Sequence, residues 1–187
     1  VTSCCATPTV DPVSWAMAIS HEGAQLATID LPFLESLTAR DREHTLECIG
    51  ASPGNQAISN AVWSGLPLKE ILGLLGVATP DGAIEMKLTG ADGYTTALPI
   101  ADLDLPVWIV WRMNGVALPE QHGTTARLLV PGRYGMKNPK WITALEFIHE
   151  PYVGFWESLG WSNTAEYRPN AFIRDPGTRA ERPAGAL

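Results

Sequence analysis

The chain has 187 residues, of which 45% are hydrophobic and 18% charged, and this balance is typical of a globular domain with one substantial core. Its formal net charge of −7 argues against nonspecific nucleic-acid binding, because that binding depends on neutralising phosphates with cations. No apolar run approaches the ~20 residues that a membrane-spanning helix requires. We therefore expect neither a nucleic-acid partner nor a transmembrane segment in this chain.

The first third of the chain predicts short strands with little helix. Residues 1–13 indicate an extended lead-in, and residues 15–20 alternate in the manner of a strand. Residues 26–37 predict a short strand followed by a brief helix. Residues 44–50 predict another strand, and residues 51–60 contain enough turn formers to predict a loop.

The strongest helix prediction covers residues 63–77, where leucines and an isoleucine recur at helical spacing before Gly76. Residues 83–100 predict two strands around the GADGY turn, because Asp-Gly favours tight hairpins. Residues 105–123 predict a buried strand, a turn at Asn114-Gly115 and a loop. The remaining predicted strands cover 126–132 and 140–150.

Many short strands with few short helices predict an α+β fold, with β-rich mixed sheets in one main domain. We expect an extended N-terminal lead-in over 1–13, the main domain over 14–173 and a flexible tail over 174–187, where the sequence is polar and rich in proline and glycine.

A few residues could carry chemistry, and each has an ordinary alternative. Cys48 could present a thiolate as nucleophile or metal ligand, although most free cysteines are small buried hydrophobes. His122 could equally be a histidine with one local hydrogen bond, Asp92 a turn residue and Trp111 a core aromatic. Cys4 and Cys5 bring the cysteine count to three, so no disulfide framework follows.

The segment RLLVPGRYGMKNPKW, residues 127–141, concentrates positive charge in an acidic chain. Glycines allow backbone N–H groups to approach an anion, and an asparagine and cations add donors. Four hydrogen bonds to a charged group, at roughly 1.5–3 kcal/mol each, would hold a phosphate firmly. The alternative is a solvated basic turn. The segment lacks the Gly-Lys-Ser/Thr ending of a nucleotide phosphate loop.

Five segments occur in an order that is more specific than any one of them: TLECIG, NAVWSGLPLKEILGLLGV, ADGYTTALPI, MNGVALPEQHG and ARLLVPGRYGMKNPKWIT. This series resembles the molybdenum-cofactor domain of the sulfite oxidase family. The PTVDPVSWAMAI and GFWESLGW segments resemble bacterial members, and the similarity covers roughly residues 8 to 165. The resemblance implies a sulfite oxidase-like molybdopterin-binding fold and a molybdenum-molybdopterin cofactor.

The resemblance also implies roles for individual residues. Cys48 matches the cysteine whose thiolate binds molybdenum, and Trp111 occupies the place of an active-site tyrosine, so these two are the expected catalytic residues. The positions that match cofactor-binding residues of the family, besides Cys48, are Asp92, His122, Arg127, Lys137, Asn138, Pro139 and Lys140.

The chain departs from sulfite-oxidising members near the metal position. Those members carry arginines just after the cysteine, whereas CIGASPGNQ contains none. Tryptophan also offers an N–H donor but no phenol. The C-terminal dimerisation domain of dimeric sulfite oxidases does not fit in the residues that remain. These departures leave the substrate more open than the cofactor.

Three functions are compatible with the sequence. The first is a molybdenum-dependent oxidoreductase acting on a small sulfite-like or sulfoxide-like molecule, with a haem protein or membrane subunit as redox partner. The second is a catalytically degenerate molybdopterin- or anion-binding domain. The third is a cysteine hydrolase that uses Cys48 and His122, which requires hydrogen-bond reach between them and leaves the basic segment unexplained.

The chain begins at Val1 without methionine or a signal sequence. We therefore expect a processed or truncated product. Together with the resemblance to membrane-attached bacterial relatives, this start predicts an extracytoplasmic location or membrane association through segments absent from this chain.

Overall fold

A computed structural model describes residues 6–51 and 57–169 of the chain. Within these ranges the elements, in chain order, are β1 Ala16–His21, β2 Ala24–Asp30, α1 Leu31–Ser36, β3 Arg40–Glu47, β4 Ile58–Pro67, α2 Leu68–Leu74, β5 Glu85–Gly90, β6 Thr95–Pro99, η1 Ile100–Asp104, β7 Trp108–Met113, β8 Val116–Ala117, α3 Glu120–Gly123, β9 Arg127–Leu129, η2 Gly135–Lys137, β10 Ile142–Ile148 and α4 Phe155–Ser158. Short strands with few short helices confirm the predicted α+β class.

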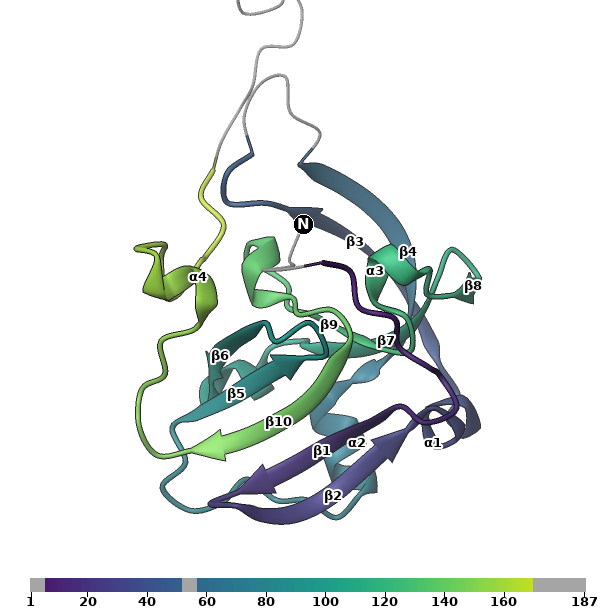
Figure 1. Cartoon of the computed structure of the whole chain (residues 1–187), viewed down its shortest axis with the longest axis horizontal. Helices are drawn as coiled ribbons and strands as arrows, with labels where there is room; N and C mark the ends of the chain where they lie inside the picture. The colour runs from purple at the N-terminus through teal and green to yellow at the C-terminus, as the bar shows by residue number, and fades with distance from the viewer. Residues whose placement is uncertain (1–5, 52–56, 170–187) are drawn as a thin grey trace, which may run out of the picture.

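Two sheets form the body of the molecule (Figure 1). The first, sheet A, has the order β2-β1-β10-β5-β6, and within it β1 and β10 pair in parallel. The second, sheet B, has the order β3-β4-β7-β8, with β9 also paired to β7. The parallel pair places the C-terminal ends of β1 and β10 at the same edge, although more than a hundred residues separate these strands in sequence.

The main hydrophobic core lies between the two sheets. It contains Met17 of β1 and Leu145 of β10 from sheet A, and Ile109 of β7 and Leu128 of β9 from sheet B. The buried leucines and isoleucine of α2 pack into the same core. Because alternate residues of a strand face opposite sides, Trp108 and Val110 of β7 belong to a second, smaller cluster on the other face of sheet B.

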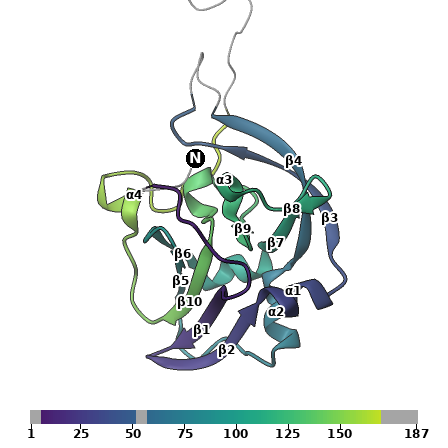
Figure 2. The same ribbon diagram turned by 45° about the vertical axis from the view of Figure 1, so that its right-hand side comes forward.

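Strands β3 and β4 form a long antiparallel ribbon, which the views of Figures 1 and 2 both show curving along one side of the molecule. The ribbon crosses β7 closely at Gly65. A Cβ atom at Gly65 would lie 2.1 Å from the backbone oxygen of Ile109, so only glycine fits there. Cys48 lies at the end of the ribbon where the chain passes from β3 towards β4.

The sequence prediction was wrong at the start of the strongest helix. Residues 63–67 belong to β4, and α2 begins only at Leu68. Pro67, with its extended backbone (ψ 135°), separates the two elements, and Trp63 and Gly65 pair with strand neighbours. The leucine spacing predicted the helix correctly, but the strand before it shares the same apolar run.

Other predictions differ at the element boundaries. The strand predicted at 44–50 begins at Arg40 and ends at Glu47, and residues 58–60 of the predicted loop are the start of β4. The loop expected before His122 contains the short helix α3. The turn at Asn114-Gly115 is confirmed, because both residues have the positive φ angles, 52° and 80°, of a tight hairpin.

The predicted lead-in is described from Ala6 onward, and the predicted tail over 174–187 lies outside the described residues. Among the helices of the described part, none is both long enough and apolar enough to cross a membrane.

Candidate functional site

A cavity of about 380 Å³ opens where the end of the β3–β4 ribbon faces the segment that precedes β10. Its size falls in the range of small-molecule sites. Widely separated parts of the chain meet in its wall, and the lining residues are Thr7, Leu46, Glu47, Cys48, Ala57, Ser59, Gln121, His122, Arg127, Gly135 and Lys140. The cavity therefore brings together four of the residues that the sequence singled out: Cys48, His122, Arg127 and Lys140.

Cys48 directly follows β3 and closes the ribbon's end. Its backbone N–H donates to the carbonyl oxygen of Ala57 at 2.8 Å, and its own carbonyl accepts from Ala51 at 2.9 Å. The residue is half-buried and free of any disulfide. Its ordinary alternative, a cysteine sealed in the core, does not hold, because Cys48 lines the cavity.

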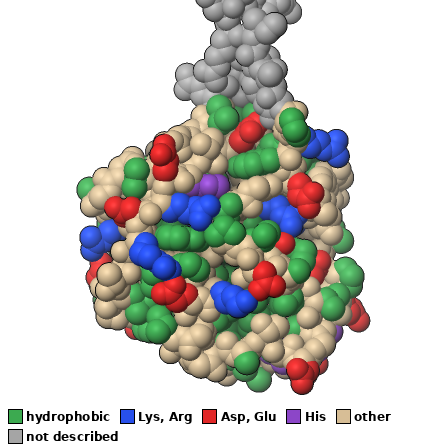
Figure 3. Space-filling model, turned by 180° about the vertical axis from the view of Figure 1, so that it is seen from behind, with side chains coloured by type: hydrophobic (Ala, Val, Ile, Leu, Met, Phe, Trp, Pro, Cys, Tyr) green, Lys and Arg blue, Asp and Glu red, His purple; other side chains and the backbone are tan. Residues whose placement is uncertain are grey.

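All four cationic residues of the segment 127–141 are buried, with exposed fractions of 4% for Arg127, 8% for Arg133, 2% for Lys137 and 7% for Lys140. The solvated basic turn, which was the alternative for this segment, is therefore wrong. The face of the molecule drawn in Figure 3 contrasts with this interior, because its Lys and Arg side chains are scattered among acidic and hydrophobic ones.

Two of these buried cations are neutralised by carboxylates. Arg133 donates to both oxygens of Asp102, at 2.9 and 3.0 Å. Lys137 Nζ lies 2.5 Å from Glu157 Oε1 and also donates to Thr96 Oγ1 and the carbonyl oxygen of Ala97. Burial lowers the pKa of Lys137, and its hydrogen bond with Glu157 opposes that shift. Both side chains thus contribute to the packing of the fold. Their positive charges are neutralised by carboxylates and do not face the cavity.

Arg127 is different, because its partners in the described part of the chain are all uncharged. Its Nη1 donates to the carbonyl oxygen of His122 at 3.1 Å and its Nη2 to that of Asn138 at 3.2 Å. The guanidinium lies 5.0 Å from the ring centroid of Trp63. Its buried Nε has no hydrogen-bond partner in the described part of the chain. Burial lowers the pKa of Arg127 to about 9.

Lys140 adds to the positive wall, and His122 lies on the same wall. Lys140 Nζ donates to the carbonyl oxygen of Gln121 at 2.9 Å and lies 4.0 Å from the Trp141 ring centroid. Burial, followed by repulsion from Arg127, lowers the pKa of Lys140 to about 8, while Asp92 opposes the shift. Burial also lowers the pKa of His122, with smaller effects from Arg127 and Lys140.

Asp92 and the 138–139 backbone shape the site without lining the cavity. Asp92 Oδ1 accepts the N–H of Tyr94 at 3.1 Å, which confirms its role in the turn, and burial raises its pKa. Asn138 Oδ1 accepts the N–H of Val130 at 2.6 Å, and the Pro139 carbonyl accepts from Leu128 at 3.0 Å. These bonds fix the loop whose carbonyl groups orient Arg127.

Trp111 lies elsewhere. Its side chain is buried in the main core between the sheets, and it lines a separate hollow beside Arg112 and Thr124. Among the described residues that line the Cys48 cavity, Trp111 is absent. The hydrolase alternative also lacks its defining contact, since no hydrogen bond joins Cys48 to His122 in the described ranges.

Sequence reasoning missed several wall residues, including Thr7, Ser59 and Gln121. Thr7 belongs to the lead-in and Ser59 to a stretch that was expected to be a loop. Trp63 belongs to the smaller hydrophobic cluster, and its ring also supports the guanidinium of Arg127. A usable signal was present for Ser59 alone, because the nearby β-branched residues Ile58 and Val62 favour a strand that could pair with 44–47.

A family model, the oxidoreductase molybdopterin binding domain, matches residues 4–156. The chain belongs to this family. Mouse mitochondrial sulfite oxidase (Mus musculus) is 25% identical over 174 residues, an alignment that covers 80% of this chain and 32% of that protein. The uncharacterized oxidoreductase YuiH of Bacillus subtilis is 31% identical over 137 residues, with 71% and 68% covered. The chain thus spans about a third of the length of the sulfite oxidases that it matches.

The fold is shared with a solved enzyme structure. The crystal structure of the sulfane dehydrogenase SoxCD from Paracoccus pantotrophus superposes with a TM-score of 0.67 at 22% identity. The alignment covers 77% of this chain and 40% of that one. This likeness establishes the sulfite oxidase-like molybdopterin-binding fold.

The cavity of this oxidoreductase molybdopterin binding domain fits the cofactor that its family implies. Cys48 lies on one part of the cavity wall. A soft thiolate ligand suits a metal that is also bound by other sulfur atoms. Elsewhere, Arg127 and Lys140 are buried without a carboxylate at ion-pair distance in the described chain, and the Nε of Arg127 lacks any partner there. Buried charges are normally paired, so this wall is suited to an anionic group of a ligand.

Proposed function

We propose that this chain is the cofactor domain of a molybdenum-dependent oxidoreductase that acts on a small sulfite-like or sulfoxide-like molecule. In this proposal the thiolate of Cys48 binds the metal. The observation that carries it is one cavity that joins the Cys48 position to two buried cations, Arg127 and Lys140, which have no carboxylate at ion-pair distance among the described residues. The family membership supplies the cofactor class.

The bound molybdenum cofactor supplies the transfer of oxygen and electrons to or from the substrate. The protein's own residues position it. Cys48 is held by two backbone hydrogen bonds at the ribbon's end, which fixes where its sulfur can bind. Arg127 is held by two carbonyl groups and the Trp63 ring, so its Nε is a pre-oriented donor to an anionic oxygen. Lys140 adds a second positive charge beside it.

The part of the cavity next to Cys48 favours a neutral substrate over a dianion. The sequence that follows Cys48 contains no arginine up to Ile58, and Glu47 lies on the cavity wall next to the cysteine. Without arginines in that segment, a sulfite dianion lacks a cationic partner from it, whereas a sulfoxide-like substrate carries no net charge and needs none. Net oxidation or reduction also requires electrons to leave or enter, so the proposal includes a haem protein or membrane subunit as redox partner, in an extracytoplasmic or membrane-associated setting.

The test is molybdenum and pterin analysis of the chain produced with molybdate, together with the Cys48→Ser variant. We expect wild-type protein to carry one molybdenum per chain and to reduce or oxidise a substrate from a sulfoxide and sulfite panel. Cys48→Ser should keep the circular dichroism of the wild type and lose turnover by at least about a hundredfold. Cys4→Ser and Cys5→Ser are the matched controls and should retain both properties.

Unchanged turnover in Cys48→Ser would refute the assignment of the metal ligand. Absence of molybdenum and of any pterin in well-folded wild-type protein would refute the cofactor assignment.

A second candidate is a cofactor- or anion-binding domain without catalysis. The missing arginines after Cys48 and the burial of Trp111 in the main core favour it. Protein that carries stoichiometric molybdenum but turns over no member of the substrate panel, even with artificial electron donors and acceptors, would support this candidate.

A further inference from the structure

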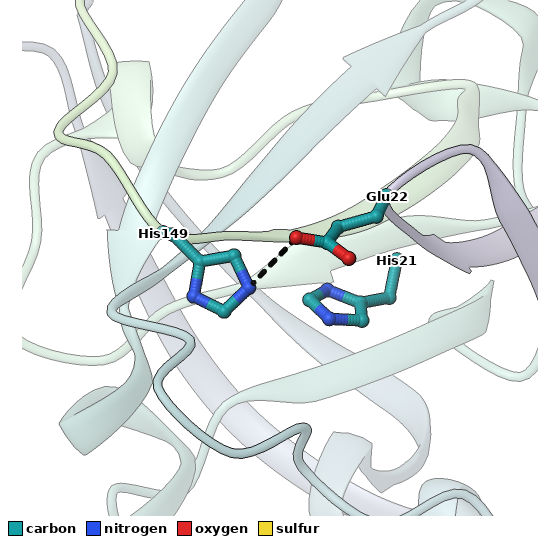
Figure 4. Close-up of side chains that lie close together, drawn as sticks. All are labelled: His21, Glu22 and His149. Atoms are coloured by element: carbon teal, nitrogen blue, oxygen red, sulfur yellow. Dashed lines mark ion pairs between the residues drawn. The ribbon is translucent and has the colours of Figure 1, made fainter.

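Three potential metal ligands converge at an edge of sheet A, away from the Cys48 cavity. His21 ends β1, Glu22 lies in the tight turn between β1 and β2, and His149 directly follows β10. Parallel pairing of β1 with β10 sets His21 opposite Phe147, which brings His149 to the same edge. Figure 4 shows the Glu22 carboxylate and both imidazole rings facing one another.

The spacing of these side chains approaches that of a metal site. One ligand atom from each residue can be chosen so that all three lie within 4.8 Å of one another. His149 Nε2 and Glu22 Oε1 are 3.4 Å apart. Tetrahedral zinc with bonds of about 2.0–2.1 Å places its ligand atoms about 3.3 Å apart. That pair already has the required separation, and His21 needs a small side-chain movement.

The surroundings orient the two histidines. His21 Nδ1 lies 3.1 Å from the carbonyl oxygen of Phe147. Because a carbonyl only accepts, Nδ1 carries the proton and Nε2 keeps its lone pair, which is the arrangement typical of metal-bound histidine. The His149 ring packs at Gly82, where a Cβ atom would lie 3.3 Å from Nδ1.

The local charge also favours a cation. A hollow of about 360 Å³ beside the cluster is lined by Glu22, Glu146 and Glu150 with Lys87 and His149. Lys87 pairs with Glu146 at 3.4 Å, so the carboxylates outnumber the ammonium group. A divalent ion placed here would meet excess negative charge.

We propose that His21, Glu22 and His149 form a binding site for a divalent transition-metal ion of the zinc type, with water completing the coordination. Two imidazoles and one carboxylate suit zinc, nickel or copper, whereas magnesium and calcium prefer oxygen ligands alone. The site lies at the opposite end of β10 from Lys140, and this seven-residue strand spans ~23 Å at ~3.3 Å per residue. The ion would tie the β1–β2 hairpin to the segment after β10.

Calorimetric titration of Zn²⁺ tests the proposal. The full chain is used with Cys4→Ser, Cys5→Ser and Cys48→Ser introduced together, so that no thiol competes for the ion. We expect one equivalent to bind and to raise the unfolding temperature. His149→Ala and Glu22→Gln should each weaken Zn²⁺ binding by at least tenfold and remove most of the thermal shift.

Glu150→Gln is the matched control, because Glu150 lines the same hollow without belonging to the ligand cluster. Its affinity should stay within about threefold of the parent, and Mg²⁺ should produce no thermal shift. Failure to bind Zn²⁺ at millimolar concentration would overturn the proposal and reduce the cluster to an ion pair. Binding that His149→Ala and Glu22→Gln leave unchanged would overturn it as well.

Discussion

Arg127 and Arg133 are both buried arginines of one short segment, yet their surroundings differ. Arg133 pairs with Asp102, whereas in residues 6–51 and 57–169 the hydrogen bonds of Arg127 go to carbonyl groups and its guanidinium lies over the Trp63 ring. The lowered pKa of Arg127, about 9, reports the cost of burying its charge. At the scale of single residues, this unpaired charge is the clearest sign that part of the structure serves a ligand rather than stability.

Replacing these arginines should therefore change stability in opposite directions. In cofactor-free protein, Arg127→Met should raise the free energy of unfolding by about 1–3 kcal/mol, because it removes an uncompensated buried charge at the cost of two hydrogen bonds. Arg133→Met should lower it by about 3–5 kcal/mol, since Asp102 would be left buried without its partner. Urea denaturation measures both.

The same Arg127→Met variant should lose function while it gains stability. A charged hydrogen bond worth about 1.5–3 kcal/mol corresponds to at least a tenfold loss in cofactor affinity, which molybdenum analysis after dialysis would detect. A destabilised Arg127→Met protein that retains its molybdenum would contradict the role given to this residue.

His44 makes the stability of the folded state depend on pH in the acid range. Burial, followed by repulsion from Arg42 and Arg127, lowers the pKa of His44 from 6.5 to about 4. Between these values the unfolded chain binds a proton that the folded chain does not, so stability falls as pH drops from 6.5 to 4. Allowing for partial exposure, the loss attributable to His44 is about 1–3 kcal/mol.

His44→Leu should remove this component. Urea denaturation of cofactor-free protein at pH 7 and pH 4.5 should show a smaller loss of stability on acidification for His44→Leu than for the wild type. Equal losses in the two proteins would assign the acid sensitivity to other groups.

At the scale of elements, the buried Lys137–Glu157 ion pair links η2 to α4, and hydrogen bonds of Lys137 link both to β6. Lys137 lies in η2, Glu157 in α4, and the remaining partners Thr96 and Ala97 in β6. Both charged side chains are only 2% exposed. A buried pair contributes little net stability when intact, but either charge is costly when it is left alone.

Double-mutant analysis tests this reading. Glu157→Leu alone and Lys137→Met alone should each cost about 3–5 kcal/mol of unfolding free energy, whereas the double variant should cost at least about 2 kcal/mol less than either single variant. Additive losses, measured by urea denaturation, would show that the two charges do not depend on each other.

These elements also show what the sequence could predict. Hairpin chemistry placed the Asn114-Gly115 turn, and leucine spacing placed α2, because both depend on local geometry. The cluster of cations in 127–141 predicts an anion site, and that site stays a prediction. The carboxylates that neutralise Arg133 and Lys137 are 31 and 20 residues away, so no local pattern could separate the structural cations from the two that face the cavity. Local signals did favour a core position for Trp111, but its distance from the Cys48 cavity depends on how the two sheets pack.

At the scale of the whole molecule, the cavity joins parts of the fold that belong to different sheets. Cys48 and Ser59 lie at the end of the sheet B ribbon, whereas Lys140 lies just before β10 of sheet A. A ligand that binds both walls would link the two sheets, and a ligand that binds only the folded state stabilises that state by mass action.

Cofactor-loaded protein should therefore unfold at a higher temperature than cofactor-free protein. At a free ligand concentration of about 100 times Kd the gain is about 2.7 kcal/mol, which corresponds to a rise of roughly 5–10 °C for a chain of this size. Calorimetry of matched preparations measures the shift, and the Cys48→Ser chain is expected to show less of it. Coincident transitions of loaded and cofactor-free protein would contradict a ligand that bridges the sheets.

The composition of the cavity wall has a consequence for the order of events during biosynthesis. Thr7 near the beginning of the chain and Lys140 in its last third face the same space. A nascent chain cannot complete that space until residue 140 has left the ribosome. Cofactor insertion in the proposed enzyme must therefore follow translation of nearly the whole domain, as a late step of maturation.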